Sequence, residues 1–238
     1  MAMTPMHRQP ILRTDIGRRL LTAVIVVPIL LAAIFGPPWL LTIVAVVGAM
    51  VALREFHDLI ARMTAVSRTT KLFRFSSSLG GTLYIAGGLT AFSLLAFGTN
   101  GPGWVLLALS TTWLGDVGAY VVGHAVGRRP LAPSISPNKT VEGAMGGAVA
   151  AMVLAAVVAH GFIESVTLPM ALALGLSANV LGQVGDLLES ALKRAAGVKD
   201  SGILVYGYGG MLDKVDSLLV AAPWLLFCQR FVATPGVS

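Results

Sequence analysis

Residues 143–163 read GAMGGAVAAMVLAAVVAHGFI and contain no Asp, Glu, Lys or Arg. A helix needs about 20 mainly apolar residues to cross the hydrocarbon core of a bilayer, so this stretch predicts a transmembrane helix. The same criterion, applied outward along the chain, gives about seven candidate spans. We therefore predict an all-α fold, that of a polytopic integral membrane protein. The candidate spans lie near residues 19–36, 39–53, 78–97, 104–126, 143–163, 168–188 and 217–233.

The composition supports this fold class. Of the 238 residues, 55% are hydrophobic and 12% are charged, whereas about 25% are charged in soluble globular domains. The net charge of +6 is more typical of membrane loops that face anionic headgroups than of nucleic-acid binding. We therefore expect the lipid bilayer as a partner and no nucleic acid. The single cysteine, Cys228, excludes an intrachain disulfide.

The first apolar stretch could be a secretory signal peptide, because Arg18 and Arg19 precede it. However, Pro37 and Pro38 follow it without a small-residue cleavage site, and comparable apolar stretches come later. We expect a retained first span.

Lys and Arg occupy alternate loops. Sixteen of the 17 lie in the segments 8–19, 54–74, 128–139 and 193–214, and only Arg230 lies elsewhere. With seven spans, these four segments fall on one face of the membrane, and cytoplasmic loops are the ones that carry an excess of Lys and Arg. The pattern predicts a cytoplasmic N-terminus and an external C-terminus.

Residues 54–74 join two of the spans and mix apolar with charged side chains. Both an amphipathic helix at the cytoplasmic surface and a solvated linker fit this composition. We divide the chain into residues 1–77, which hold the N-terminal spans and this linker, and residues 78–238, which hold the motifs described next.

Asp116 lies inside the span 104–126, where a charge is costly and usually faces a protein interior or a water-filled cavity. The functional interpretation is a polar cavity, and the structural alternative is a hydrogen bond between helices. The segment GRRPLAPSISPNKTVEGAMGG follows directly and carries Lys139, Thr140 and Glu142. Its prolines stiffen the backbone, and its Lys and Thr side chains could hold phosphate oxygens.

A second cluster reads GDLLESALKRAAGVKD from residue 185 and GYGGMLDKVDSLL from residue 207. Asp186 and Glu189 are three residues apart, as are Asp213 and Asp216, so each pair projects from nearly one face of a helix. Such carboxylates at a helix end could hold Mg²⁺, which prefers oxygen ligands and commonly binds substrate phosphates. A solvated acidic face is the alternative.

Bases and glycines surround these acids. Ser190, Lys193, Arg194 and Lys199 supply hydrogen-bond donors and positive charge. The glycines at 209 and 210 let the backbone approach a ligand closely. Carboxylates, a metal and bases together indicate phosphate chemistry. The four histidines are too scattered for a zinc site, and no GxxxxGK[ST] loop is present.

This cluster resembles the phosphatidate cytidylyltransferase family, also called CDP-diacylglycerol synthases. The family pattern runs S-x-x-K-R-x4-K-D, then a His-Gly-Gly turn, then D-R-x-D. The resemblance extends over roughly residues 78–231 and includes the Asp116 segment. Three residues depart from the pattern: Tyr208 stands in place of His, Lys214 in place of Arg, and Tyr206 where Pro is usual. Ser190, Lys193, Arg194, Lys199, Asp200, Gly209, Gly210, Asp213 and Asp216 match in order and spacing.

The resemblance implies a nucleotidyltransferase of the cytoplasmic (inner) membrane, with its active site on the cytoplasmic side. It would transfer a cytidylyl group from CTP to phosphatidate, giving CDP-diacylglycerol and pyrophosphate for phospholipid biosynthesis. The implied cofactor is Mg²⁺, and a second metal and a homodimer stay open. The implied roles are catalysis for Lys193, Arg194, Lys199, Asp200, Tyr208 and Lys214; substrate binding for Asp116, Lys139, Thr140, Glu142, Ser190, Gly209 and Gly210; and metal binding for Asp186, Asp213 and Asp216.

Two alternatives remain at this point. A paralogue in the same family could use another nucleotide or another lipid phosphate, which the tyrosine at 208 favours. A membrane transporter belongs to a different class, and in it the intramembrane Asp116 and Asp186 would line the transport pathway.

Overall fold

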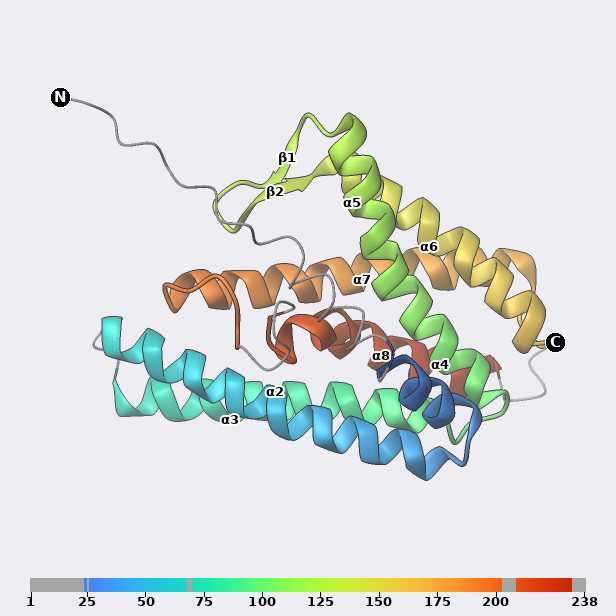
Figure 1. The fold of residues 1–238 in the computed structure, drawn as a ribbon, viewed down its shortest axis with the longest axis horizontal. Coiled ribbons are helices and arrows are strands. Elements are labelled where there is room, and N and C mark those ends of the chain that lie inside the picture. The colour runs from blue at the N-terminus through green and yellow to red at the C-terminus, as the bar shows by residue number, and fades with distance from the viewer. Residues whose placement is uncertain (1–23, 25, 68–69, 203–208, 233–238) are drawn as a thin grey trace.

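The structure is a computed structural model that describes residues 24, 26–67, 70–202 and 209–232 (Figure 1). Long helices dominate it, and one short antiparallel hairpin interrupts them. A shorter apolar helix, Val26–Phe35, precedes the others. The elements are α2 (Pro38–Ser67), α3 (Lys71–Leu95), α4 (Gly101–Leu109), the π-helical η1 (Ser110–Leu114), α5 (Gly115–Val126), β1 (Pro130–Ala132), β2 (Ser136–Thr140), α6 (Val141–Phe162), α7 (Leu168–Ala195) and α8 (Leu212–Val232).

Six stretches of helix in the described part are long and apolar enough to cross a membrane, which confirms the polytopic all-α prediction. They are α2, α3, the continuous run from α4 through η1 to α5, α6, α7 and α8. Of the first expected span, near 19–36, the structure describes mainly the helix Val26–Phe35.

Four helices differ from the predicted boundaries. Helix α7 ends at Ala195 instead of near 188, and α8 begins at Leu212 instead of 217. The second span was expected to end near residue 53, but α2 continues to Ser67, and α3 begins at Lys71 instead of 78. For α2 the reason is burial: Phe56, Leu59 and Ile60 are 8%, 1% and 3% exposed. The apolar face of residues 56–60 thus packs inside the protein instead of on a membrane surface. The division of the chain at residue 77 stays a prediction.

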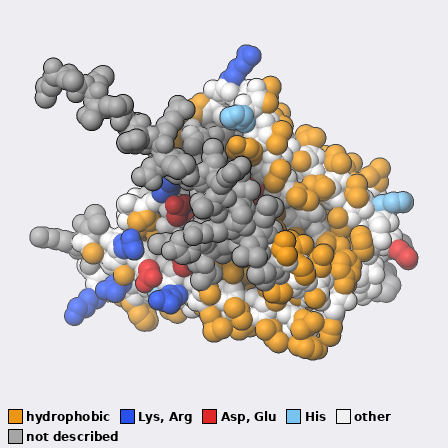
Figure 2. Space-filling view, in the orientation of Figure 1, with side chains coloured by type: hydrophobic (Ala, Val, Ile, Leu, Met, Phe, Trp, Pro, Cys, Tyr) orange, Lys and Arg blue, Asp and Glu red, His pale blue; other side chains and the backbone are white. Residues whose placement is uncertain are grey.

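The helices pack in the order α5, α6, α7, α8, α3, α2. In Figure 1 the pair α2 and α3 lies below α7 and α8, and α5, the hairpin and α6 lie above. The end of α2, the start of α3 and the end of α7 lie together at the left of this view. Two of the basic segments therefore lie at the same end of the molecule, and Figure 2 shows several Lys and Arg side chains there.

Helix α6 shows how composition separates lipid-facing from buried surface. Its small residues at four-residue spacing, Gly147, Ala151 and Ala155 among them, are buried against neighbouring helices. Val153 and Val157, on the opposite face, are 56% and 64% exposed. Small side chains allow close helix approach in membranes, and the valines suit contact with acyl chains. Figure 2 shows the apolar surface that results.

A close contact between α7 and α8 positions the site. A Cβ placed on Gly185 would collide with the backbone carbonyl oxygen of Asp216 and would come 3.1 Å from Val220 Cγ2. Only glycine permits this approach. It brings the acidic segment of α7 directly against the acidic segment of α8.

Candidate active site

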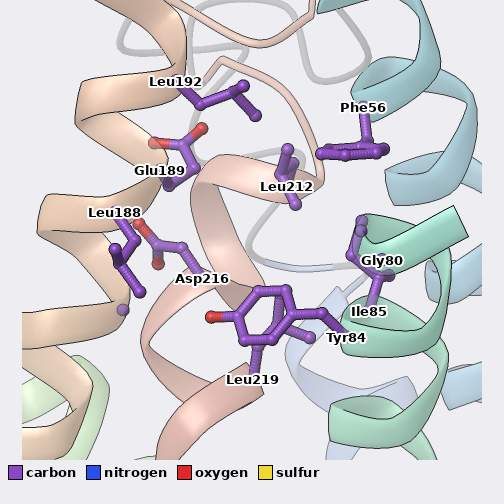
Figure 3. Close-up of a pocket in the computed structure, with 12 residues that line it drawn as sticks. Phe56, Gly80, Tyr84, Ile85, Leu188, Glu189, Leu192, Leu212, Asp216 and Leu219 are labelled. Atoms are coloured by element: carbon purple, nitrogen blue, oxygen red, sulfur yellow. The ribbon is translucent and has the colours of Figure 1, made fainter. Parts of the chain in front are cut away.

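Two cavities flank α7, and its residues help to line both. A polar cavity of about 530 Å³ lies between α5, the hairpin, α6 and α7. A smaller cavity of about 260 Å³ lies between α2, α3, α7 and α8 (Figure 3). The polar cavity is lined by Asp116, Ala119, Tyr120, Gly123, His124, Leu131, Asn138, Lys139, Thr140, Gly143, Ala144, Gln183 and Asp186.

The smaller cavity is mainly apolar. Its polar side chains are Tyr84, Glu189 and Asp216. Figure 3 shows Glu189 from α7 and Asp216 from α8 on one side of it and the ring of Tyr84 from α3 on the other. The remaining lining residues are Phe56, Gly80, Gly81, Ile85, Gly185, Leu188, Leu192, Leu212 and Leu219.

The hairpin places Lys139 against α7. Strands β1 and β2 pair antiparallel with Pro130 opposite Thr140, so the hairpin folds back over the start of α6. The Lys139 ammonium forms an ion pair with the Asp186 carboxylate, and the Ser190 hydroxyl donates to the same carboxylate at 3.3 Å. Thr140 accepts a hydrogen bond from Gly143 N–H at 3.1 Å and so caps α6. The structure therefore brings the two predicted motif segments together.

A second ion cluster lies where α7 meets the start of α8. Lys193 Nζ lies 2.7 Å from Asp213 Oδ1 and also pairs with Glu189. Asp213 Oδ2 accepts from the backbone N–H groups of Gly210 at 2.8 Å and Ser201 at 3.3 Å. Both oxygens of Asp213 are thus engaged by the protein itself.

Three aspartates come from three helices: Asp116 and Asp186 line the polar cavity, and Asp216 lines the smaller one. Asp116 of α5, Asp186 of α7 and Asp216 of α8 are close enough for each to repel the other two electrostatically. The Lys139 ammonium forms an ion pair with one of them, Asp186. Three carboxylates formally carry more negative charge than this one ammonium group offsets.

The donor set fits a magnesium ion that arrives with phosphates. Carboxylates are hard oxygen donors, and the excess charge favours a divalent cation. In the part of the chain that the structure describes, no three acid, His or Cys side chains are close enough to hold one ion together. Mg²⁺ is commonly held by one or two carboxylates while substrate phosphates supply further ligands, and Asp186 and Asp216 can serve in that way.

Other predicted residues contact the protein's own backbone. Arg194 donates to the carbonyl oxygens of Ile135 and Val198, both at 3.2 Å, so it ties the hairpin to the end of α7. Glu142 accepts from the N–H groups of Arg128 at 3.0 Å and Arg129 at 3.1 Å. Both residues hold the hairpin in place.

The predicted residues near α8 differ in exposure, in hydrogen bonding and in backbone conformation. Lys199 and Asp200 are exposed after α7. The carbonyl oxygen of Lys214 accepts a hydrogen bond from the Trp113 indole at 3.0 Å. Gly209 has φ +84°, which glycine adopts readily, and it precedes the turn into α8. Tyr208 lies outside the described residues.

The sequence interpretation missed Glu55 and Tyr84. Glu55 is 7% exposed, and Met211 and Leu212 donate backbone hydrogen bonds to it at 3.0 and 2.9 Å. Periodicity could have found it, because Ala52, Glu55 and Phe56 continue one buried helical face. An acidic residue on an otherwise apolar helix face indicates that its carboxylate has hydrogen-bond partners inside the protein.

Comparison with known proteins identifies the family. Residues 60–232 match the profile of the cytidylyltransferase family. A phosphatidate cytidylyltransferase of Bacillus subtilis strain 168 is 47% identical over 126 residues, which is 52% of this chain and 46% of the relative. One from Staphylococcus saprophyticus is 40% identical over 127 residues, 53% of this chain and 49% of the relative. The uncharacterized protein YnbB of Escherichia coli K12 is 41% identical over 127 residues, 53% and 42% of the two chains.

The chain spans about half the length of the curated relatives it matches. The family profile nevertheless extends over most of the 238 residues, from the second half of α2 to the end of α8. This protein belongs to the cytidylyltransferase family.

Proposed function

We propose that this protein transfers a cytidylyl group from CTP to phosphatidate, giving CDP-diacylglycerol and pyrophosphate. The proposal places it in the cytoplasmic membrane with the N-terminus and the site on the cytoplasmic side. The observation that carries it is the close contact of α7 with α8, which puts Asp186 and Asp216 between a polar and an apolar cavity. A water-soluble nucleotide and a lipid phosphate need such a pair of cavities.

The polar cavity suits the nucleotide. Its volume of about 530 Å³ lies within the range of roughly 300–1,000 Å³ that is usual for small-molecule sites. Asn138, Thr140 and Gln183 offer hydrogen-bonding groups for a base or ribose, and Lys139 offers charge for phosphates. Lys139 is paired with Asp186 in this structure, so phosphate binding would exchange one anionic partner for another.

The apolar cavity suits the lipid. Leu188, Leu192 and Leu219 line it, and the Tyr84 ring forms part of its wall (Figure 3). A phosphatidate bound there would direct its phosphate toward Asp216 and Glu189. The carboxylates of Asp216 and Glu189 would repel the lipid phosphate, so cations must lie between them and the phosphate. Lys193, which pairs with Glu189, is one such cation.

The chemistry requires positioning more than proton transfer. A phosphatidate oxygen is already anionic near neutral pH, so it can attack the α-phosphorus of CTP without a protein base. One phosphorus–oxygen bond forms, the bond from the α-phosphorus to the oxygen bridging to the β-phosphorus breaks, and pyrophosphate leaves with that electron pair. Rate then depends on in-line alignment and on neutralising the charge of the transferring group.

We assign Asp186 and Asp216 as the residues that would hold Mg²⁺, with Asp116 beside them. When bound, the ion would neutralise phosphate charge and fix the relative positions of the two substrates. Lys139 would bind nucleotide phosphates, and Lys193 would offset part of the charge of Asp213 and Glu189 at the start of α8. A second metal stays open.

The decisive experiment is an assay of the purified chain in lipid vesicles or detergent with labelled CTP and phosphatidate. We expect a labelled product that comigrates with CDP-diacylglycerol, together with pyrophosphate. Lys139→Met should lose most of this activity, and Lys71→Met, which removes an exposed charge at the start of α3, should not. A lipid product made only with another nucleotide or another lipid phosphate would favour the paralogue. No nucleotide-dependent product at all would reject the proposal.

A further inference from the structure

Glu55 is a buried acid on α2 that lines neither cavity. Burying a charged group is costly unless hydrogen bonds compensate. The Ser201 hydroxyl donates to Oε2 at 3.1 Å, the Met211 N–H to Oε1 at 3.0 Å and the Leu212 N–H to Oε2 at 2.9 Å. Ser201 and Met211 lie between α7 and α8, and Leu212 is the first residue of α8.

These contacts make Glu55 a cap for α8. The helix begins at Leu212, and the first N–H groups of a helix have no partner within it. A carboxylate is suited to that end because the helix dipole is positive there. The capping group is therefore supplied by α2, more than 150 positions earlier in the chain.

The glycines of this turn make room for the carboxylate. A Cβ on Gly202 or on Gly210 would come 2.8 Å from Glu55 Cδ, closer than real Cβ atoms approach. The N–H of Gly210 also donates to Asp213 Oδ2 at 2.8 Å. The turn at Gly210 is thus held between two carboxylates, Glu55 on the α2 side and Asp213 on the α8 side.

We propose that Glu55 is a positioning residue of the site: it fixes where α8 begins and thereby aims Asp213 and Asp216. This proposal rests on the proposed function for the reaction that it serves. Asp213 lies in the first turn of α8 and Asp216 in the next, so a shift of the helix start moves both. The hydrogen bonds of Glu55 reach none of the elements that line the polar cavity. Loss of its carboxylate should therefore impair the transfer step and leave nucleotide binding intact.

The test compares Glu55→Gln with Asp58→Asn, which neutralises an exposed acid three residues later on the same helix. Glutamine has one acceptor oxygen, so its NH₂ group would face an N–H or hydroxyl donor. We expect kcat to fall about 10- to 100-fold, as for a displacement on the order of 1 Å, with the KM for CTP within about twofold of the parent. Asp58→Asn should match the parent in both.

A second measurement is independent of activity. Hydrogen exchange of a peptide covering residues 209–216 should be faster in Glu55→Gln, because either the Met211 or the Leu212 amide loses its acceptor. The proposal is overturned if exchange and kcat both match the parent, or if the variant unfolds globally at a much lower temperature and loses CTP binding as well. If the parent itself makes no lipid product, the proposed function fails, and the exchange result alone then decides whether Glu55 fixes the start of α8.

Discussion

Replacement of Gly185 by alanine tests the contact that places the two acidic helices together. The added methyl group would collide with the Asp216 carbonyl oxygen and lie 3.2 Å from its carbonyl carbon. Backbone cannot move aside as a flexible side chain does, so α7 and α8 must separate. Overpacking of this kind costs about 1–3 kcal/mol of stability. A displacement on the order of 1 Å between reacting groups costs about 100-fold in rate.

Gly87→Ala in α3 is the matched control, because nothing lies within 4 Å of a Cβ placed there. Alanine should stabilise that helix by up to about 1 kcal/mol. Both variants are measured by thermal unfolding in detergent and by initial rates with CTP and phosphatidate. We expect Gly185→Ala to lose about 100-fold in kcat while the control keeps parental activity. If Gly185→Ala retained parental activity, the close contact of α7 and α8 would not be what positions the aspartates.

Three further predictions follow from the same geometry. Asp216→Asn should abolish turnover at any Mg²⁺ concentration while the protein still folds, because the substitution removes the charge of the side chain and keeps its size. Near-parental activity of this variant at low Mg²⁺ would exclude the metal assignment. Lys193→Met should lower stability by about 3–5 kcal/mol, because the buried Glu189 and the partly buried Asp213 lose their shared base. Unchanged thermal unfolding would contradict this. In a Cys228→Ser background, an impermeant thiol reagent should label Thr99→Cys and not Ser134→Cys in intact cells; the reverse pattern would invert the topology.

The fold was largely predictable because each span must by itself be long and apolar enough to cross the bilayer. The spans expected at 143–163 and 168–188 correspond to α6 (Val141–Phe162) and α7 (Leu168–Ala195), since length and apolar content decide them. The end of α2 was missed because Arg54, Glu55 and Asp58 lower its hydropathy, while their helix continues along the interior. Local hydropathy does not report tertiary burial.

Irregular backbone was not predictable in the same way. The span expected at 104–126 is one continuous run from Gly101 to Val126, but it contains the π-helical turn Ser110–Leu114. There the hydroxyls of Thr111 and Thr112 donate to carbonyl oxygens one turn earlier. Such turns depend on packing against other helices, and they often occur at functional sites.

The acids of the site were predicted as residues, but their partners were not. Asp186 and Glu189 are three apart on α7, as expected for one face, yet Asp186 meets Lys139 at the polar cavity and Glu189 meets Lys193 at the apolar one. The boundary between the cavities passes between them. Spacing within a helix fixes the angle between two side chains, but only the neighbouring helices decide what each of them faces.

Because its residues line both cavities, α7 is also the wall that separates them. Residues on its two sides line two cavities of different polarity, and its glycine at 185 admits the backbone of α8 at the level of Asp186. For the proposed transfer, a thicker wall would hold nucleotide and lipid too far apart for in-line attack. A thinner wall would open the apolar cavity to the polar one. The proposed two-substrate reaction therefore requires the small residue at 185 as much as it requires Asp186.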